Sequence, residues 1–192
     1  RAPCTNSRTN HEPRSPRIVA ARRSFLQEGR FAFQGSLSET DEEGRNPWLL
    51  LEKRQADGAI PVIGDANSMT YVLHKKLGDV IVLPRGDGEI RLRLVAALRD
   101  SIFQGELLMA EENFLEVFPE QEGYRVLLVR AGNEPVAGLE AKLEEGFADL
   151  GAQVIGTAER LAQFHRVENT YLSTFQTLGG LGLLLGTFGL AT

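Results

Sequence analysis

The sequence predicts an α+β fold, in which a β-rich middle precedes a strand–helix–strand–helix unit and an apolar C-terminal helix. Three observations support this prediction. Residues 60–98 contain short runs of apolar and β-branched residues, which are typical of strands. Residues 133–152 carry apolar side chains three or four positions apart, as one face of a helix does. No charged side chain follows Glu168, although 24% of all residues are charged, an ordinary share for a soluble globular protein.

Four segments are predicted before residue 55. In order, they are an extended lead-in (1–24), a half-buried strand (25–37), a charged loop (38–47) and an apolar run that would pair in a sheet (48–54). Prolines among polar and basic residues leave the lead-in without a period that could bury one face. In the strand, Phe31, Phe33 and then Leu37 alternate with small or polar residues, so one face would be buried.

The middle of the chain is predicted to be mostly β. Its elements are strands at 60–63, 79–83 and 90–98 and a short helical or turn segment at 67–73. Residues 85–88 read Arg-Gly-Asp-Gly, and an Asp-Gly pair tolerates the positive φ that tight hairpins require. The strands on either side of this turn are therefore expected to form a β-hairpin.

The elements after the middle are predicted from periodicity and from their stop signals. They are a short helix within 109–120, a buried strand at 124–131, an amphipathic helix at 133–152, a strand at 153–156 and a long helix from near Thr157. Pro119 is expected to stop the first helix, and Gly151 the second. The order strand, helix, strand, long helix resembles a βαβ unit that leads directly into the uncharged tail.

The tail, residues 170–192, is predicted to enter a membrane. About 20 apolar residues cross a bilayer core of about 30 Å, so the run is long enough. Glycines such as Gly179 would each cost up to about 1 kcal/mol in a water-exposed helix, whereas small residues permit close helix approach in lipid. Gly182 and Gly186 have the spacing of such a packing motif. The alternatives are a buried core helix and a Gly-rich loop packed against the domain.

Composition narrows the classes of partner. The net charge of -5 and the lack of a clustered basic face argue against a nucleic-acid partner. Arg17, Arg22 and Arg23 belong to a basic run near the start of the chain, which a solvated segment explains equally well.

Cys4 is the only cysteine, so it cannot form an internal disulfide. Because residue 1 is Arg and the chain ends inside its apolar run, the sequence is expected to be a piece of a longer protein.

Catalytic, cofactor and metal sites are not predicted. Asp65, Asn67, Ser68 and His74 contain the residue types of a triad, but sequence proximity does not supply its geometry. Turns that start the following helical segment are the favoured interpretation of Asp65 and Asn67. The histidines lie far apart without Cys or carboxylates at ligand spacing, and the chain lacks a GxxxxGK[ST] phosphate loop.

Several stretches together resemble a known family. LSTFQTLGGLGLLLGTFGLAT is similar to the start of the second membrane helix of FtsX-like permeases of ABC transporters, the group that includes the MacB-type exporters. NPWLLL, IPVIGDANSMTYVLHKKLGD and AERLAQFHRVENTYLSTF resemble the extracytoplasmic domain that precedes this helix in one branch of the family. The resemblance extends from about Phe25 to Thr192, and the junction with the tail is its most specific part.

The resemblance implies a non-catalytic domain of a permease in the cell inner (plasma) membrane. Residues 25–168 would form an extracytoplasmic, periplasmic core like that of MacB, with a β-rich inserted portion at about 60–118 and a membrane-adjoining βαβ portion. Residues 169–192 would begin a transmembrane helix. The implied partners are a separate ATPase subunit or domain, a second permease copy or half, the lipid bilayer and a periplasmic partner protein, and no cofactor is implied.

A helix that continues from a folded domain into a membrane can transmit a displacement as a rigid lever. The coupling residues would be Glu159, Arg160, Phe164, Arg166 and Tyr171, and the membrane-helix packing residues would be Gly179, Gly182 and Gly186. The expected function is therefore to couple ATP-driven helix movement to export or mechanotransmission. The alternative is a soluble ligand-binding or hydrolytic domain whose Gly-rich tail packs on it or forms an oligomer seam.

Overall fold

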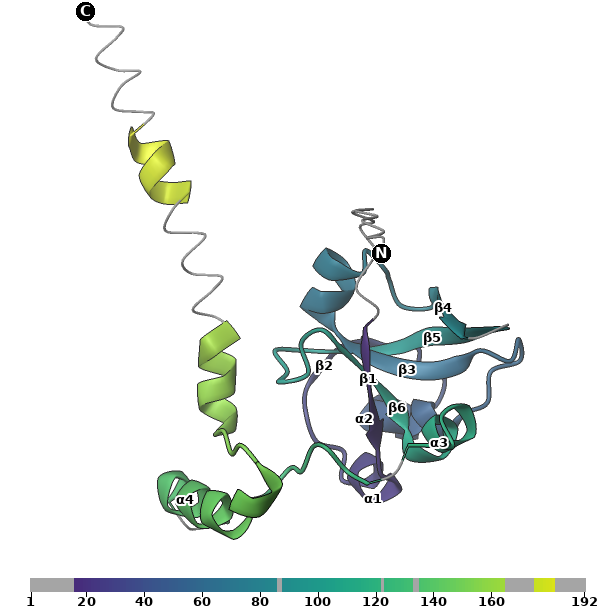
Figure 1. Ribbon diagram of the computed structural model, residues 1–192. Coiled ribbons are helices and arrows are strands. Elements are labelled where there is room, and N and C mark those ends of the chain that lie inside the picture. The colour runs from purple at the N-terminus through teal and green to yellow at the C-terminus, as the bar shows by residue number, and fades with distance from the viewer. Residues whose placement is uncertain (1–15, 86–87, 122, 133–134, 165–174, 182–192) are drawn as a thin grey trace, which may run out of the picture. The chain divides into compact units, whose positions relative to one another are not determined.

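The computed structural model describes residues 16–85, 88–121, 123–132, 135–164 and 175–181 (Figure 1). The chain divides into two compact units, an N-terminal unit that ends at Gly123 and a C-terminal unit that begins at Tyr124. The N-terminal unit contains a six-stranded mixed sheet and several helices, and its fold is α+β. Each unit is described separately.

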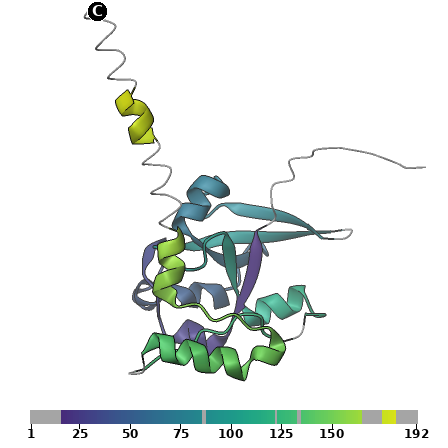
Figure 2. The ribbon, with the colours of Figure 1, turned by 60° about the vertical axis from the view of Figure 1, so that its left-hand side comes forward.

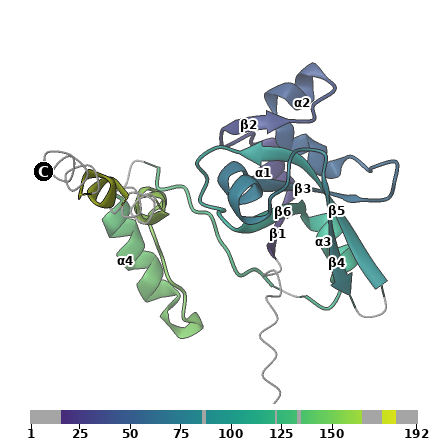
Figure 3. The same cartoon turned by 90° about the horizontal axis from the view of Figure 1, so that it is seen from above.

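The sheet has the strand order β1-β6-β3-β5-β2, and β4 also pairs with β5. The strands are β1 (Arg17–Ala21), β2 (Phe33–Ser36), β3 (Ile60–Asp65), β4 (Val80–Arg85), β5 (Gly88–Leu98) and β6 (Glu106–Ala110). The β1–β6 and β3–β5 pairs are parallel, and the other pairs are antiparallel. The first half of β5 pairs with β4 and its end pairs with β2, so two short strands share this long one (Figure 3).

Short helices accompany the sheet in the N-terminal unit. They are α1 (Arg23–Gln27), α2 (Asp41–Arg45), the 3₁₀ helix η1 (Pro47–Glu52), the π-helical turn η2 (Ser68–Val72) and α3 (Glu111–Val117). The core consists of two clusters of buried residues. Because side chains alternate along a strand, β6 places Leu108 in one cluster and Leu107 and Met109 in the other. The central strands are therefore buried on both faces, which explains their nearly continuous apolar sequence.

The first cluster is centred on Trp48 and lies against α1 and η1. Trp48 is fully buried, and its indole N–H donates to the backbone carbonyl of Arg30. The rings of Phe25 and Phe33 meet the indole edge-on, with centroids 4.9 and 5.6 Å from it. This arrangement attaches the segment before β2 to the face of the sheet.

The predicted lead-in is wrong where the structure describes it. Residues 17–21 form the strand β1, which lies beside β6 (Figures 1 and 2), and α1 starts at Arg23. The partner strand of β1 is almost ninety residues away in the sequence, so no local pattern predicts this pairing. The predicted strand at 25–37 is confirmed only for 33–36.

The two following segments also differ from the prediction. The charged loop contains the helix α2, whose N-cap Thr40 and Glu43 form a complete capping box. The apolar run after it is the 3₁₀ helix η1 rather than a strand. Pro47 starts this helix without a backbone donor, and Trp48 and Leu51, three residues apart, are both buried.

The middle of the chain agrees well with the sequence. Strands β3, β4 and β5 and the helical turn η2 lie where periodicity predicts them, and β4 and β5 pair antiparallel as a hairpin. The helix α3 is also confirmed, although it is shorter than 109–120. The sequence does not predict the strand β6, because the last two residues of this strand lie inside the helix predicted at 109–120.

The C-terminal unit departs most from the prediction. The predicted helix is confirmed for residues 136–146, which form α4 (Val136–Gly146). It ends before the predicted stop: Gly151, at φ +63°, caps the short 3₁₀ helix η3 (Ala148–Leu150) instead. Neither 124–131 nor 153–156 forms a strand in the described structure, so the predicted βαβ unit is absent there. A strand needs a partner for its backbone donors and acceptors, and no strand lies among the residues described in this unit.

Candidate functional site

The predicted coupling helix begins where the sequence places it. Residues 157–164 are helical, and the N–H of Arg160 donates to the carbonyl of Gly156 over 2.9 Å. The guanidinium of Arg160 lies 5.2 Å from the ring centroid of Phe164, one helical turn later. Glu159 and Arg160 are exposed, and Phe164 is half-buried. Three of the predicted coupling residues thus share one helix.

Close backbone packing fixes the start of this helix on α4. A Cβ at Gly156 would lie 2.9 Å from Oε1 of Glu140 and 3.5 Å from Cγ1 of Val136, so the backbone passes directly against these side chains. Glycine permits this approach because it has no side chain. The two helices of the C-terminal unit are therefore in contact where the second begins.

The tail is described only at residues 175–181, which are helical. Phe175, Leu178 and Leu181 are exposed there by 71%, 64% and 56%, and the space around Gly179 is open. The other predicted residues, Arg166, Tyr171, Gly182 and Gly186, lie outside the described residues, as does most of the predicted membrane span. Among the helices that the structure does describe, none has both the length and the apolar character needed to cross a bilayer.

The C-terminal unit exposes much apolar surface. No residue described in it is buried, and the predicted buried strand is instead a mostly exposed segment without regular secondary structure. Its exposed apolar side chains are Tyr124, Val126, Leu127, Leu128 and Val129. Contiguous exposed apolar residues of this kind mark surfaces that contact another protein or a membrane.

Asp65 and Ser68, which have residue types found in a catalytic triad, belong to a turn and are not arranged as a nucleophile and its base. Asp65 is fully buried, and its Oδ1 accepts from the N–H groups of Asn67 and Ser68 over 3.1 and 3.2 Å. This confirms the predicted turn at Asp65, which starts η2. The Oδ2 atom accepts from the N–H and hydroxyl of Ser101 over 3.3 and 3.0 Å. His74 is not a hydrogen-bond partner of either Asp65 or Ser68 in these contacts.

The hydroxyl of Ser68 is held from both sides. It donates to Asp65 Oδ1 over 3.4 Å and accepts from the N–H of Gly105 over 2.8 Å. The network therefore joins the end of β3 to the loop before β6. Within the described part of the chain, no group of three or more His, Cys, Asp and Glu side chains is placed to hold a metal ion.

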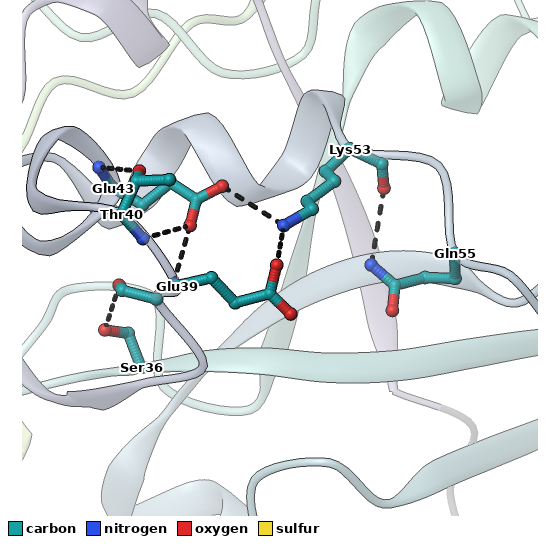
Figure 4. Close-up of polar contacts among 7 residues, drawn as sticks. Ser36, Glu39, Thr40, Glu43, Lys53 and Gln55 are labelled. Atoms are coloured by element: carbon teal, nitrogen blue, oxygen red, sulfur yellow. Dashed lines mark hydrogen bonds and ion pairs between the residues drawn. The ribbon is translucent and has the colours of Figure 1, made fainter.

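The acidic segment before η1 forms an ion-pair cluster with Lys53 (Figure 4). Lys53 Nζ contacts both Glu39 and Glu43, and Glu43 Oε2 accepts from the N–H groups of Glu39 and Thr40 over 2.7 and 3.1 Å. The N–H of Glu39, with that of Thr40 and the Lys53 ammonium, lowers the pKa of Glu43. The hydrogen bond to Glu39 raises the pKa of Lys53. These contacts tie α2 to the end of η1.

A second ion-pair cluster crosses the β-hairpin. Arg91 and Arg93 both donate to Asp57 Oδ2, over 3.1 and 2.8 Å, and Arg93 also donates to the carbonyl of Gly78. The hydrogen bond from Arg93 lowers the pKa of Asp57. The three charges are paired with one another, although the buried Nε of Arg93 has no hydrogen-bond partner among the described residues, and these contacts give the cluster a structural role.

An apolar groove of about 370 Å³ lies in the N-terminal unit. Its walls come from β1, β4, β5 and α3 and include Ile18, Leu83, Ile90, Phe114 and Phe118. The rings of Phe114 and Phe118 are 5.0 Å apart, and the guanidinium of Arg85 lies 5.5 Å from the centroid of Phe118. The i, i+4 spacing of the two phenylalanines is visible in the sequence, but nothing in it joins them to β1 or to Arg85.

When the chain is compared with models of protein families, with curated proteins and with solved structures, no match is found.

Proposed function

We propose that this chain is the extracytoplasmic domain of an FtsX-like ABC-transporter permease, together with the start of its second membrane helix. The observation that carries the proposal is the sequence that follows the start of the described helix at Thr157: its last charged side chain is Glu168, and the residues after that are uncharged and mostly apolar or glycine. The exposed apolar side chains of 175–181 support it, because such a helix is stable where lipid or protein covers it.

The domain would act mechanically, without catalysing a reaction. ATP hydrolysis by a separate subunit would move the membrane helices, and the helix from Thr157 would carry that movement to the domain outside the membrane. The packing of Gly156 against α4 supports this role, because it gives the helix a fixed contact at its outer end. The stacking of Arg160 on Phe164 stiffens the first turns in the same way. The moving element would thus be rigid where it meets the domain.

The α+β architecture is compatible with a MacB-like core, and the six-stranded sheet would correspond to its β-rich portion. The exposed apolar segment 124–129 and the exposed side chains of α4 would then contact parts of the permease, a second permease copy or a periplasmic partner. The domain would face the periplasm from the inner membrane.

The first test is membrane insertion. Two reporter fusions, one ending at Glu168 and one at Thr192, should differ in carbonate extraction: only the longer one should stay in the membrane fraction. If both are extracted and fold equally well, residues 170–192 are a packed element of a water-soluble domain, and the permease proposal is wrong.

The second test separates insertion from coupling. Four glycines inserted beside Arg166 in the complete permease should uncouple ATP turnover from transport, because each glycine costs a helix about 1 kcal/mol relative to alanine. Four alanines at the same place add the same length while favouring the helix, and should preserve coupling far better. Equal transport by the two variants would contradict the lever mechanism, but it would not contradict the prediction that the tail inserts into the membrane.

A further inference from the structure

The apolar groove of the N-terminal unit has the size and lining of a small-molecule site. Sites for small ligands have volumes of about 300–1,000 Å³ and combine mainly apolar and aromatic walls with a few polar groups. This groove has a volume of about 370 Å³, and Phe114 and Phe118 supply aromatic faces. The polar side chains that line it are Arg85 and Gln121.

Arg85 is a cation without an ionic partner in the described structure. Its guanidinium is held over the ring of Phe118, with 5.5 Å between the two groups. None of the ion pairs among the described residues includes it, in contrast to Arg91 and Arg93 on the neighbouring strand. None of the described side chains that line the groove is acidic. The groove therefore offers one positioned positive charge beside apolar walls.

We propose that the groove binds a small organic acid with an aromatic or aliphatic body, whose carboxylate pairs with Arg85. The body would lie against Phe114, Phe118 and Leu83. A guanidinium matches a carboxylate with two parallel hydrogen bonds, and such charge-assisted bonds are about twice as strong as neutral ones. This site stands whether or not the tail crosses a membrane.

The charge of Arg85 selects an anion over a neutral ligand of the same shape. A neutral apolar molecule that filled the groove would remove water from the guanidinium without replacing its hydrogen bonds, which is unfavourable. A carboxylate replaces them. A cationic ligand would face the charge of Arg85, and the lining residues that the structure describes include no carboxylate to offset it. The groove should therefore bind an organic acid more tightly than the corresponding neutral amide.

The experiment compares para-fluorohydrocinnamate with its uncharged primary amide, which has the same aromatic body. Binding to the full chain in zwitterionic lipid nanodiscs is followed by fluorine NMR line broadening, with empty nanodiscs as the blank. The acid should bind at least about fivefold more tightly than the amide, in keeping with one charge-assisted contact at a partly exposed site. Equal binding of the two, or no binding of the acid, would overturn the proposal.

Variants identify Arg85 as the source of that preference. Arg85→Gln should reduce binding of the acid to the level of the amide, whereas Arg85→Lys should retain part of the preference. Arg54→Gln removes the same charge from an exposed residue outside the groove and should change nothing. Phe118→Leu should weaken both probes. If Arg85→Gln keeps its fold by circular dichroism and still prefers the acid, the groove is not the binding site.

Discussion

At the scale of single residues, Trp48 has the largest fully buried side chain among the described residues. It is fully buried, three phenylalanine rings surround it, and its N–H is paired with a backbone carbonyl. Large aromatic side chains combine a large buried apolar area with specific edge-to-face contacts. The residue therefore fixes both the packing and the path of the chain before β2.

We expect Trp48→Ala to lower the free energy of unfolding by about 3–5 kcal/mol, since it leaves a large cavity. Trp48→Phe keeps an aromatic ring and loses the N–H donor, so its cost should be about 1–2 kcal/mol. Denaturant unfolding of the full chain, followed by far-UV circular dichroism, measures both. Equal midpoints for the two variants would show that the ring packing contributes little.

Asp65 is the other residue whose loss should be costly. Its carboxylate accepts from the backbone and side chain of both Ser68 and Ser101 and from the backbone of Asn67. Asp65→Ala leaves these buried donors unpaired, so we expect a loss of about 3 kcal/mol or more in unfolding free energy. Ser101→Ala removes a single hydroxyl and should cost about 1 kcal/mol. Thermal unfolding of both variants checks the order, and a larger loss in Ser101→Ala would contradict it.

At the scale of elements, the capping box of α2 makes part of the stability dependent on pH. The pKa of Glu43 is lowered in the folded state from its ordinary value of 4.5, chiefly by the N–H of Glu39. A lowered carboxyl pKa means that the ionised form is favoured by folding. Its contribution is fully present above the unfolded pKa and is lost as the pH falls through the lower folded pKa.

Wild-type protein should therefore lose stability below about pH 4.5 more steeply than Glu43→Gln does. Glu42→Gln removes a neighbouring carboxylate that lies outside the capping box, and it is the matched control. Denaturant midpoints measured from pH 7 to pH 3 test this expectation, because proton linkage appears as a slope with pH. Parallel slopes for wild type and Glu43→Gln would show that the capping contact has no energetic effect.

The elements that the sequence predicts correctly are those whose signal is local. Strands β3, β4 and β5 show short apolar runs on either side of an Asp-Gly pair, and α4 shows apolar residues three or four positions apart. The capping box of α2 was also present, as Thr40 followed by Glu43, but the charges around it favoured a loop. The η1 segment resembles a strand in sequence, because periodicity alone does not distinguish a short apolar helix from a short apolar strand.

Elements that depend on distant partners could not be predicted. The strand β1 is defined by its pairing with β6, and no pattern within 17–21 indicates that partner. The groove could not be predicted for the same reason, since β1, the β4–β5 hairpin and α3 come together only in the folded protein. Conversely, the apolar run at 124–131 suggested a strand, but in the described structure it has no neighbour with which to pair. The turn role of Asp65, by contrast, depends on residues two and three positions away and was predicted correctly.

At the scale of the whole molecule, the two units differ in how they are stabilised. The N-terminal unit has two buried clusters on a six-stranded sheet, whereas no described residue of the C-terminal unit is buried. A domain folds independently when it has a core of its own. The first unit should therefore be autonomous, and the second should depend on a partner.

A fragment of residues 16–123 should show a single cooperative thermal transition by circular dichroism, whereas a fragment of residues 124–164 should not. Amide hydrogen exchange on the same fragments should protect β3, β5 and β6 in the first and leave the second almost unprotected. Cooperative unfolding of the second fragment alone would show that its apolar residues form a core without any partner.

The pairing of β1 with β6 also sets the order in which the N-terminal unit can form during synthesis. Arg17 pairs with Glu106, about 90 residues later. Ribosomes add about 5–20 residues per second, so β1 waits roughly 4 to 18 seconds for its partner to be made. Before that, β3, β4 and β5 can already assemble, because they are complete by residue 98. Among the six described strands, β1 is thus synthesised first, yet it can pair only after β6 has been made.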